Sequence, residues 1–131
     1  MNRLHVHVAV TELEPAVRFY THLFGAEPSR EREDYAKWSL DEPAVNFAIS
    51  ATGATAPGID HLGIETDDPV GLEAITRRLA SAEATLAAEA AATCCYAVSD
   101  KTWTSDPAGV RWESFFTHGE AALSDRQRRR G

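Results

Sequence analysis

The chain has 131 residues, a formal net charge of −7, 44% hydrophobic residues and 25% charged residues. A domain of this length buries roughly two thirds of the surface of its unfolded chain, so it needs no disulfide bond to fold. The composition is that of an ordinary globular protein and excludes a fibrous or disordered chain. The acidic balance argues against a nucleic-acid partner, because phosphate binding needs clustered Lys and Arg.

Neither a membrane span nor a disulfide is expected. No apolar stretch of the sequence approaches the roughly 18 residues that cross a bilayer, and Met1–Arg3 leads into a strand-like run, unlike a signal peptide. We therefore expect a cytoplasmic protein without a membrane partner. The two cysteines, Cys94 and Cys95, are adjacent in the sequence. A disulfide between adjacent residues is strained and constrains no long loop of the unfolded chain, so both are expected as free thiols.

The N-terminal part of the chain predicts a strand followed by a helix. The alternation from Leu4 to Val10 is typical of a strand and puts His5 and His7 on the same face. Apolar positions then follow helical spacing from 13 to 24. Thr11 is expected to cap this helix, and Gly25 to end it in a left-handed conformation.

Two further strands are predicted to form a hairpin. After a charged connection at 29–34, the runs 35–40 and 45–50 flank turn-forming residues at 41–43. The stretch 51–58, rich in small residues, then predicts a linker.

The same order of elements begins again after the linker. A strand-like run at 60–66 carries His61, 56 residues after His5, and an acidic turn precedes a helix through Leu72. Residues 84–92 favour a helix by composition, but their second part is interpreted as a strand because the repeat requires one. Three strand candidates follow at 93–98, 101–104 and 110–117, with turns at 99–100 and 106–109 between them.

The repeat predicts an α+β fold built from paired βαβββ modules. Each module makes a curved sheet with its helix on one face, and two such sheets enclose a cup. We expect one domain over residues 1–119, with the first module at about 1–52 and the second at about 58–118. The basic tail at 120–131 is expected to be a solvated terminus.

Three side chains on corresponding strands predict a metal site. They are His5 on the first strand, His61 on the matching strand of the second module, and Glu113 on the last strand. Two imidazoles and one carboxylate leave open positions on a divalent ion and are diagnostic of Fe(II) oxygen chemistry, although Mn, Ni, Co and Zn occupy similar sites. Glu113 is also the candidate catalytic residue. His7 either orients the site from behind the ligands or replaces His5 as a ligand.

The adjacent cysteines predict a site for a thiophilic ion. Soft thiolates held close together suit trivalent arsenic or cadmium. Neighbouring side chains on a regular strand point to opposite faces, so a mobile loop is expected at Cys94 and Cys95 if both bind one ion. The alternative is that one thiol is a small buried side chain and the other is incidental. Lys101 is a further candidate for substrate binding.

With these residues assembled, the chain resembles the glyoxalase/bleomycin-resistance/dioxygenase superfamily, also called the vicinal-oxygen-chelate proteins. Within that superfamily it is similar to the arsenic- and cadmium-inducible resistance branch. The resemblance covers about residues 3–118 and lies in these stretches: His5–Val10, Arg18–Tyr20, Leu23–Pro28, Asp34–Trp38, Asp60–Gly63, Thr93–Ala97, Ser99–Trp103, Asp106–Gly109 and Arg111–Glu113.

The resemblance implies an Fe(II) enzyme that uses dioxygen to cleave the carbon–arsenic bond of trivalent organoarsenicals. In that case His5, His61 and Glu113 hold iron, and Cys94 and Cys95 capture the substrate. Lyases of this branch carry glutamine at the position of His5, which changes metal preference. The alternatives are a protein that sequesters cadmium or arsenite, and another dioxygenase, glyoxalase-type enzyme or thiol transferase of the superfamily. A homodimer is implied by the family alone.

Overall fold

The computed structural model describes residues 1–94 and 97–120. Cys95 and the tail at 121–131 lie outside the described residues. The strands are β1 Arg3–Ala9, β2 Arg30–Arg32, β3 Tyr35–Asp41, β4 Ala44–Ser50, β5 Gly58–Glu65, β6 Ala87–Cys94, β7 Ala97–Ser105 and β8 Arg111–Glu120, and the helices are α1 Leu13–Phe24 and α2 Pro69–Ser81.

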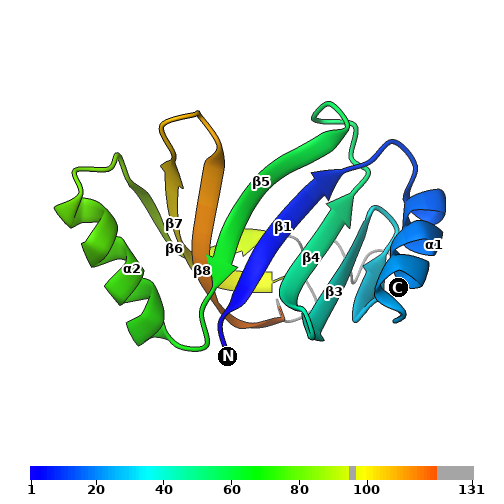
Figure 1. Ribbon diagram of the computed structural model, residues 1–131, viewed down its shortest axis with the longest axis horizontal. Coiled ribbons are helices and arrows are strands. Elements are labelled where there is room, and N and C mark those ends of the chain that lie inside the picture. The colour runs from blue at the N-terminus through cyan, green and yellow to red at the C-terminus, as the bar shows by residue number, and fades with distance from the viewer. Residues whose placement is uncertain (95–96, 121–131) are drawn as a thin grey trace.

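The strands form one eight-stranded sheet in the order β2-β3-β4-β1-β5-β8-β7-β6. β1 pairs with β4 and β5 with β8 in parallel, whereas the other neighbouring strands are antiparallel. The chain therefore builds the same βαβββ unit twice and joins the two units through the β1–β5 pair (Figure 1). This topology confirms the predicted α+β fold with paired modules.

Helix α1 covers one face of the first module with an apolar contact. Trp38 on β3 and Phe47 and Ile49 on β4 form the centre of this core, and the helix adds the side chains predicted from its spacing: Leu13, Ala16, Val17, Tyr20 and Phe24. Alternate residues such as Asn46 and Ser50 point away from the helix and line a cavity instead. The alternation thus separates an apolar face under α1 from a polar face.

Helix α2 covers the equivalent face of the second module with smaller side chains. Leu72 is the buried residue of this helix. The hydroxyls of Thr76 and Thr102 form a hydrogen bond of 2.8 Å between α2 and β7. The Asp68 carboxylate caps the helix by accepting from the backbone N–H of Gly71 at 2.8 Å.

Three local predictions were wrong. The position before α1 is occupied by Glu12, and Thr11 lies one residue too early to cap the helix. The charged connection at 29–34 contains β2, a three-residue edge strand without the apolar alternation that reveals a strand. The turn predicted at 99–100 lies inside β7, because both residues pair with β8 and the ladder overrides their local turn preference.

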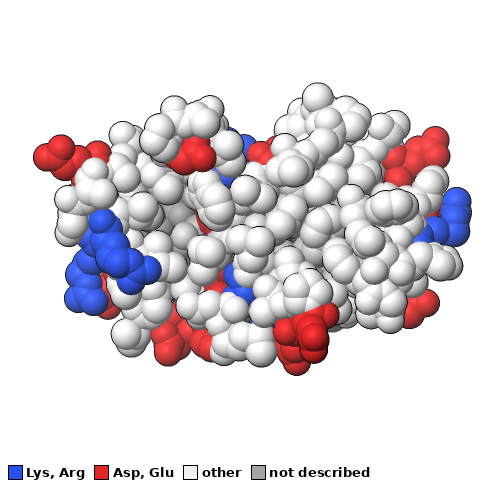
Figure 2. All heavy atoms as spheres, in the orientation of Figure 1, with Lys and Arg blue, Asp and Glu red and all other residues white. Residues whose placement is uncertain are grey.

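The surface agrees with the acidic composition. On the face shown in Figure 2, the Lys and Arg atoms form separate groups, including one over α2, and Asp and Glu atoms lie at both ends of the molecule. Neither helix in the described part of the chain is long and apolar enough to cross a membrane.

Gly63 marks a close approach of β5 to β8. A Cβ at this position would collide with the backbone carbonyl oxygen of Glu113 and lie 3.3 Å from Cδ2 of His5. Only the absence of a side chain lets β8 come close enough to place Glu113 beside His5.

We predict that Gly63→Ala lowers the free energy of unfolding by about 2 kcal/mol or more, because backbone must move to relieve the collision. Urea denaturation at neutral pH measures the change. Ser39→Ala, at an exposed strand position, is the matched control and should alter stability little. Equal midpoints for Gly63→Ala and the wild type would contradict this account of the β5–β8 contact.

Candidate metal centre

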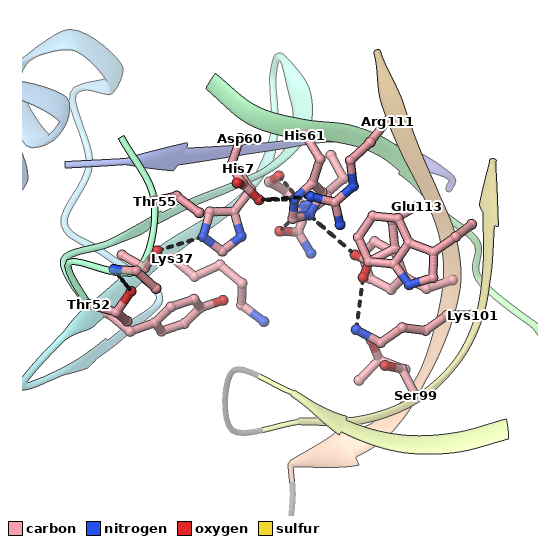
Figure 3. A pocket seen from close by; sticks show the side chains of 18 residues that line it. His7, Lys37, Thr52, Thr55, Asp60, His61, Ser99, Lys101, Arg111 and Glu113 are labelled. Carbon is pink, nitrogen blue, oxygen red and sulfur yellow. Dashed lines mark hydrogen bonds and ion pairs between the residues drawn. The ribbon is translucent and has the colours of Figure 1, made fainter. Parts of the chain in front are cut away.

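The polar face of the sheet borders a cavity of about 290 Å³. Its walls come from β1, β3 and β4 of the first module and from β5, β7 and β8 of the second (Figure 3). The lining includes the imidazoles of His5, His7 and His61, the rings of Tyr35, Trp103 and Phe115, and the charged side chains of Lys37, Asp60, Lys101, Arg111 and Glu113. The cavity therefore brings together groups from both modules.

The three predicted ligands converge at one point of this cavity. Nε2 of His5 lies 3.2 Å from Nε2 of His61. Oε1 of Glu113 lies 3.6 Å from the first nitrogen and 3.7 Å from the second. Adjacent ligand atoms bound at about 2.1 Å to one ion are roughly 3.0–3.4 Å apart. The three atoms thus form a triangle only slightly wider than a bound ion requires, and all three side chains are buried.

The hydrogen bonds of the two histidines orient their free nitrogens toward each other. Nδ1 of His5 faces the backbone oxygen of Asn46 at 3.1 Å and its side-chain oxygen at 3.2 Å. Nδ1 of His61 faces Oδ2 of Asp60 at 2.6 Å. Because an acceptor faces each Nδ1, this nitrogen donates and Nε2 keeps its lone pair. Two lone pairs and a carboxylate oxygen then face one another, a donor set that fits a divalent cation.

Lys101 forms an ion pair with the carboxylate oxygen of Glu113 that faces away from the imidazoles. Nζ of Lys101 donates a hydrogen bond to Oε2 of Glu113 at 2.8 Å, and both side chains are only 7% exposed. Burial by itself raises the pKa of Glu113, but its interactions with His61 and Lys101 together lower the pKa to about 2. The carboxylate is therefore ionised at neutral pH, with Oε2 engaged by Lys101 and Oε1 directed at the imidazoles.

The imidazoles differ in their affinity for protons. Burial lowers the pKa of His5 to about 4 and that of His7 to about 4, so both rings are neutral at neutral pH. Burial also lowers the pKa of His61, but its interactions with Glu113 and Asp60 outweigh burial and raise the pKa. His61 therefore has a higher affinity for a proton than His5 or His7.

His7 lies beside the three predicted ligands. Its Nε2 is 2.8 Å from Oγ of Ser50, and its ring centroid is 4.9 Å from that of His61. One nitrogen from each of His5, His7 and His61 lies within 4.8 Å of the others. His7 is therefore close enough to take part in the site as well as to support it.

Of the predicted substrate-binding residues, the structure describes Cys94 and Lys101. Cys94 is the last residue of β6, in register with Ala97 of β7, and Cys95 follows outside the described residues. Ser99 and Lys101 of β7 line the cavity. Cys94 thus lies on the strand that pairs with β7, which borders the cavity, and Lys101 contacts the predicted ligand Glu113.

Sequence reasoning missed the residues that orient the site, above all Asp60. Regular alternation puts neighbours on opposite faces, but the β1–β5 register shifts between His7 and Val8, so Asp60 has no paired residue there and reaches its neighbour His61. The guanidinium of Arg111 lies 3.9 Å from Oδ2 of Asp60 and 4.6 Å from the centroid of the Trp103 ring. The acidic residue directly before His61 was the one available signal.

The sequence has clear relatives. Residues 3–114 match the family model of the Glyoxalase/Bleomycin resistance protein/Dioxygenase superfamily. The trivalent organoarsenical cleaving enzyme of Bacillus sp. strain MD1 is 39% identical over 119 residues, which are 89% of this chain and 74% of that protein. The cadmium-induced protein CadI of Mycobacterium tuberculosis strain H37Rv is 33% identical over 115 residues, which are 88% of this chain and 76% of that protein.

The fold agrees with these relatives. The Mn(II)-bound glyoxalase from Novosphingobium aromaticivorans superposes with a TM-score of 0.63 at 19% identity, covering 95% of this chain and 44% of that one. The two βαβββ modules, the family model that spans most of the chain and the relatives at 33–39% identity all agree. The chain belongs to the glyoxalase/bleomycin resistance protein/dioxygenase superfamily.

Proposed function

We propose that this protein is an Fe(II)-dependent enzyme that uses dioxygen to cleave the carbon–arsenic bond of trivalent organoarsenicals and release arsenite. The observation that carries the proposal is the convergence of His5, His61 and Glu113 within 3.2–3.7 Å in a cavity beside the cysteine-bearing hairpin. The relative from Bacillus sp. strain MD1, which is named for cleaving trivalent organoarsenicals, supports the choice of substrate.

Nε2 of His5, Nε2 of His61 and Oε1 of Glu113 would hold the metal. When bound, Fe(II) supplies the activation of dioxygen, and Mn, Ni, Co and Zn suit the same donors. Lys101 engages Oε2 of Glu113, which would leave Oε1 for the metal. Asp60 and Asn46 keep both rings in the orientation and tautomer that binding requires.

The substrate is held at two points. The thiolates of Cys94 and Cys95 bind the trivalent arsenic, because soft sulfur ligands prefer such an ion. The organic group enters the cavity of about 290 Å³, which lies at the small end for ligand pockets. The rings of Trp103 and Phe115 line that cavity and limit the entry of water beside the metal.

The reaction balances with dioxygen as the oxidant. Methylarsenite plus one dioxygen gives arsenite plus formaldehyde, with every atom accounted for. The carbon–arsenic bond breaks, arsenic stays trivalent, the methyl carbon loses four electrons and dioxygen gains them. No further reductant is needed for this substrate.

A second candidate function is sequestration of cadmium or arsenite without turnover. The relative named cadmium-induced protein CadI favours it, as does the cluster of buried imidazoles at His5, His7 and His61. Tight stoichiometric uptake of the ion with no organic product would identify sequestration.

We expect His61→Ala to weaken Fe(II) binding by at least about 100-fold. The substitution removes a metal ligand and, with it, the contact through which Asp60 orients that ligand. Anaerobic equilibrium dialysis against Fe(II) measures the dissociation constant. The exposed His22 serves as the control, and His22→Ala should bind iron like the wild type. Unchanged affinity in His61→Ala would exclude His61 from the ligand set.

We expect Asp60→Asn to weaken Fe(II) binding by about 10- to 100-fold while the fold is kept, because the amide is a weaker acceptor for Nδ1 of His61. The same dialysis gives the affinity, and circular dichroism checks the fold. Wild-type affinity in this variant would show that the Asp60–His61 contact does not support metal binding.

We expect Cys94→Ser/Cys95→Ser to lose arsenite release from methylarsenite by at least about 100-fold, because the substrate is no longer positioned. Iron affinity should stay at the wild-type value, since neither thiol is among the proposed iron ligands. The assay loads apoprotein with Fe(II) anaerobically, adds methylarsenite and oxygen, and quantifies arsenite and formaldehyde. Release that survives the double substitution would point to a different substrate for this metal centre.

A further inference from the structure

A local two-fold relation links the central strands of the two modules. In the antiparallel β1–β5 pair, His5 lies opposite Gly63 and His7 lies opposite His61. Exchange of the two strands therefore maps His5 onto His61. It also maps His7 onto Gly63, so these two positions are equivalent in the two halves of the site.

The same relation extends to the next strand on each side. In the second module Gly63 is in register with Glu113 on β8, and in the first module His7 is in register with Ala48 on β4. Glu113 and Ala48 are thus equivalent positions. In the second module, the central strand has a glycine, Gly63, and the outer strand carries the ligand Glu113. In the first module, the outer strand has the small Ala48, and the central strand carries the imidazole of His7.

The geometry of His7 fits this exchanged arrangement. Its side chain is buried, and one of its nitrogens lies within 4.8 Å of one nitrogen of His5 and one nitrogen of His61. Two ligand atoms on opposite sides of one ion lie about 4.2 Å apart when each is bound at about 2.1 Å. The 4.8 Å limit on these nitrogens is only slightly wider than that spacing, so His7 lies beside the position of an ion held by the other residues.

We propose that His7 is a fourth protein ligand of the metal, supplied by the first module across the local two-fold from Glu113. This inference rests on the proposed metal site at His5, His61 and Glu113. The side chain of Ser50, whose Oγ lies 2.8 Å from Nε2 of His7, holds the ring in place before the metal binds. Three imidazoles and one carboxylate suit Fe, Ni or Zn, and a six-coordinate ion keeps two positions open for reactants.

The test counts the imidazoles that are bound to the metal. The full chain is loaded with Co(II), and proton NMR spectra are recorded in H₂O and in D₂O. Each imidazole bound to Co(II) through one nitrogen gives one strongly shifted, exchangeable N–H signal from the other. We expect three such signals from the wild type and two from His7→Gln, with Co(II) affinity reduced by about 10- to 100-fold in that variant.

Two control variants separate ligation from a structural effect. Ser50→Ala removes the partner of His7 but leaves the ring, so three signals should remain. His22→Gln changes an exposed imidazole on α1 and should also keep three.

Two signals in the wild type, unchanged in His7→Gln, would overturn the role of His7 and leave the site at His5, His61 and Glu113 intact. This count is made on the wild type, so it decides the question even if His7→Gln fails to fold. Absence of shifted imidazole signals from the wild type with Co(II) would overturn the proposed metal site and the role of His7 with it.

Discussion

The antiparallel pairing of β1 with β5 is the constraint on which the rest of the structure depends. This pair joins the two modules into one sheet and sets the register that brings His5 and His61 together from positions 56 residues apart. A slip of either strand by one residue would turn its imidazole to the face opposite the other imidazole. The apolar core under α1 fixes the face of β1, since Val6 and Val8 of this strand pack against it.

The close contact of β5 with β8 adds the carboxylate to this pair. Gly63 permits the approach, and Lys101 then pairs with the buried Glu113 from the neighbouring strand β7. Burying an ionised carboxylate costs several kcal/mol unless a partner compensates for the lost water. Lys101 supplies one such partner on Oε2, and a bound cation would supply another on Oε1. The protein thereby keeps an ionised carboxylate among buried imidazoles.

The two halves of the site share a topology but not a composition. The first module uses its outer strand β4 to orient His5 through Asn46, while the second uses its outer strand β8 to deliver Glu113. Asn46 also donates to Oε2 of Glu65 at 3.2 Å, so the polar chain behind His5 continues toward the end of β5. A duplicated unit thus gives one centre in which equivalent positions perform different tasks.

The sequence alone determined the order of the elements apart from the edge strand β2, the doubled module and the candidates His5, His61 and Glu113. Local periodicity encodes which face a side chain takes, and the histidines at matching strand positions expose the repeat. The same local rules misplaced the β6–β7 turn, because Ser99 and Asp100 favour turns in isolation but pair with β8 in the folded chain.

Only the tertiary structure decided which groups meet across strands. The contacts of Lys101 with Glu113 and of Asp60 with His61, and the position of His7 opposite His61, depend on strand register and on an irregularity within β5. Register between strands distant in the chain follows from the packing of the whole sheet against its helices. No local pattern of residues carries that information, which is why these contacts required the folded chain.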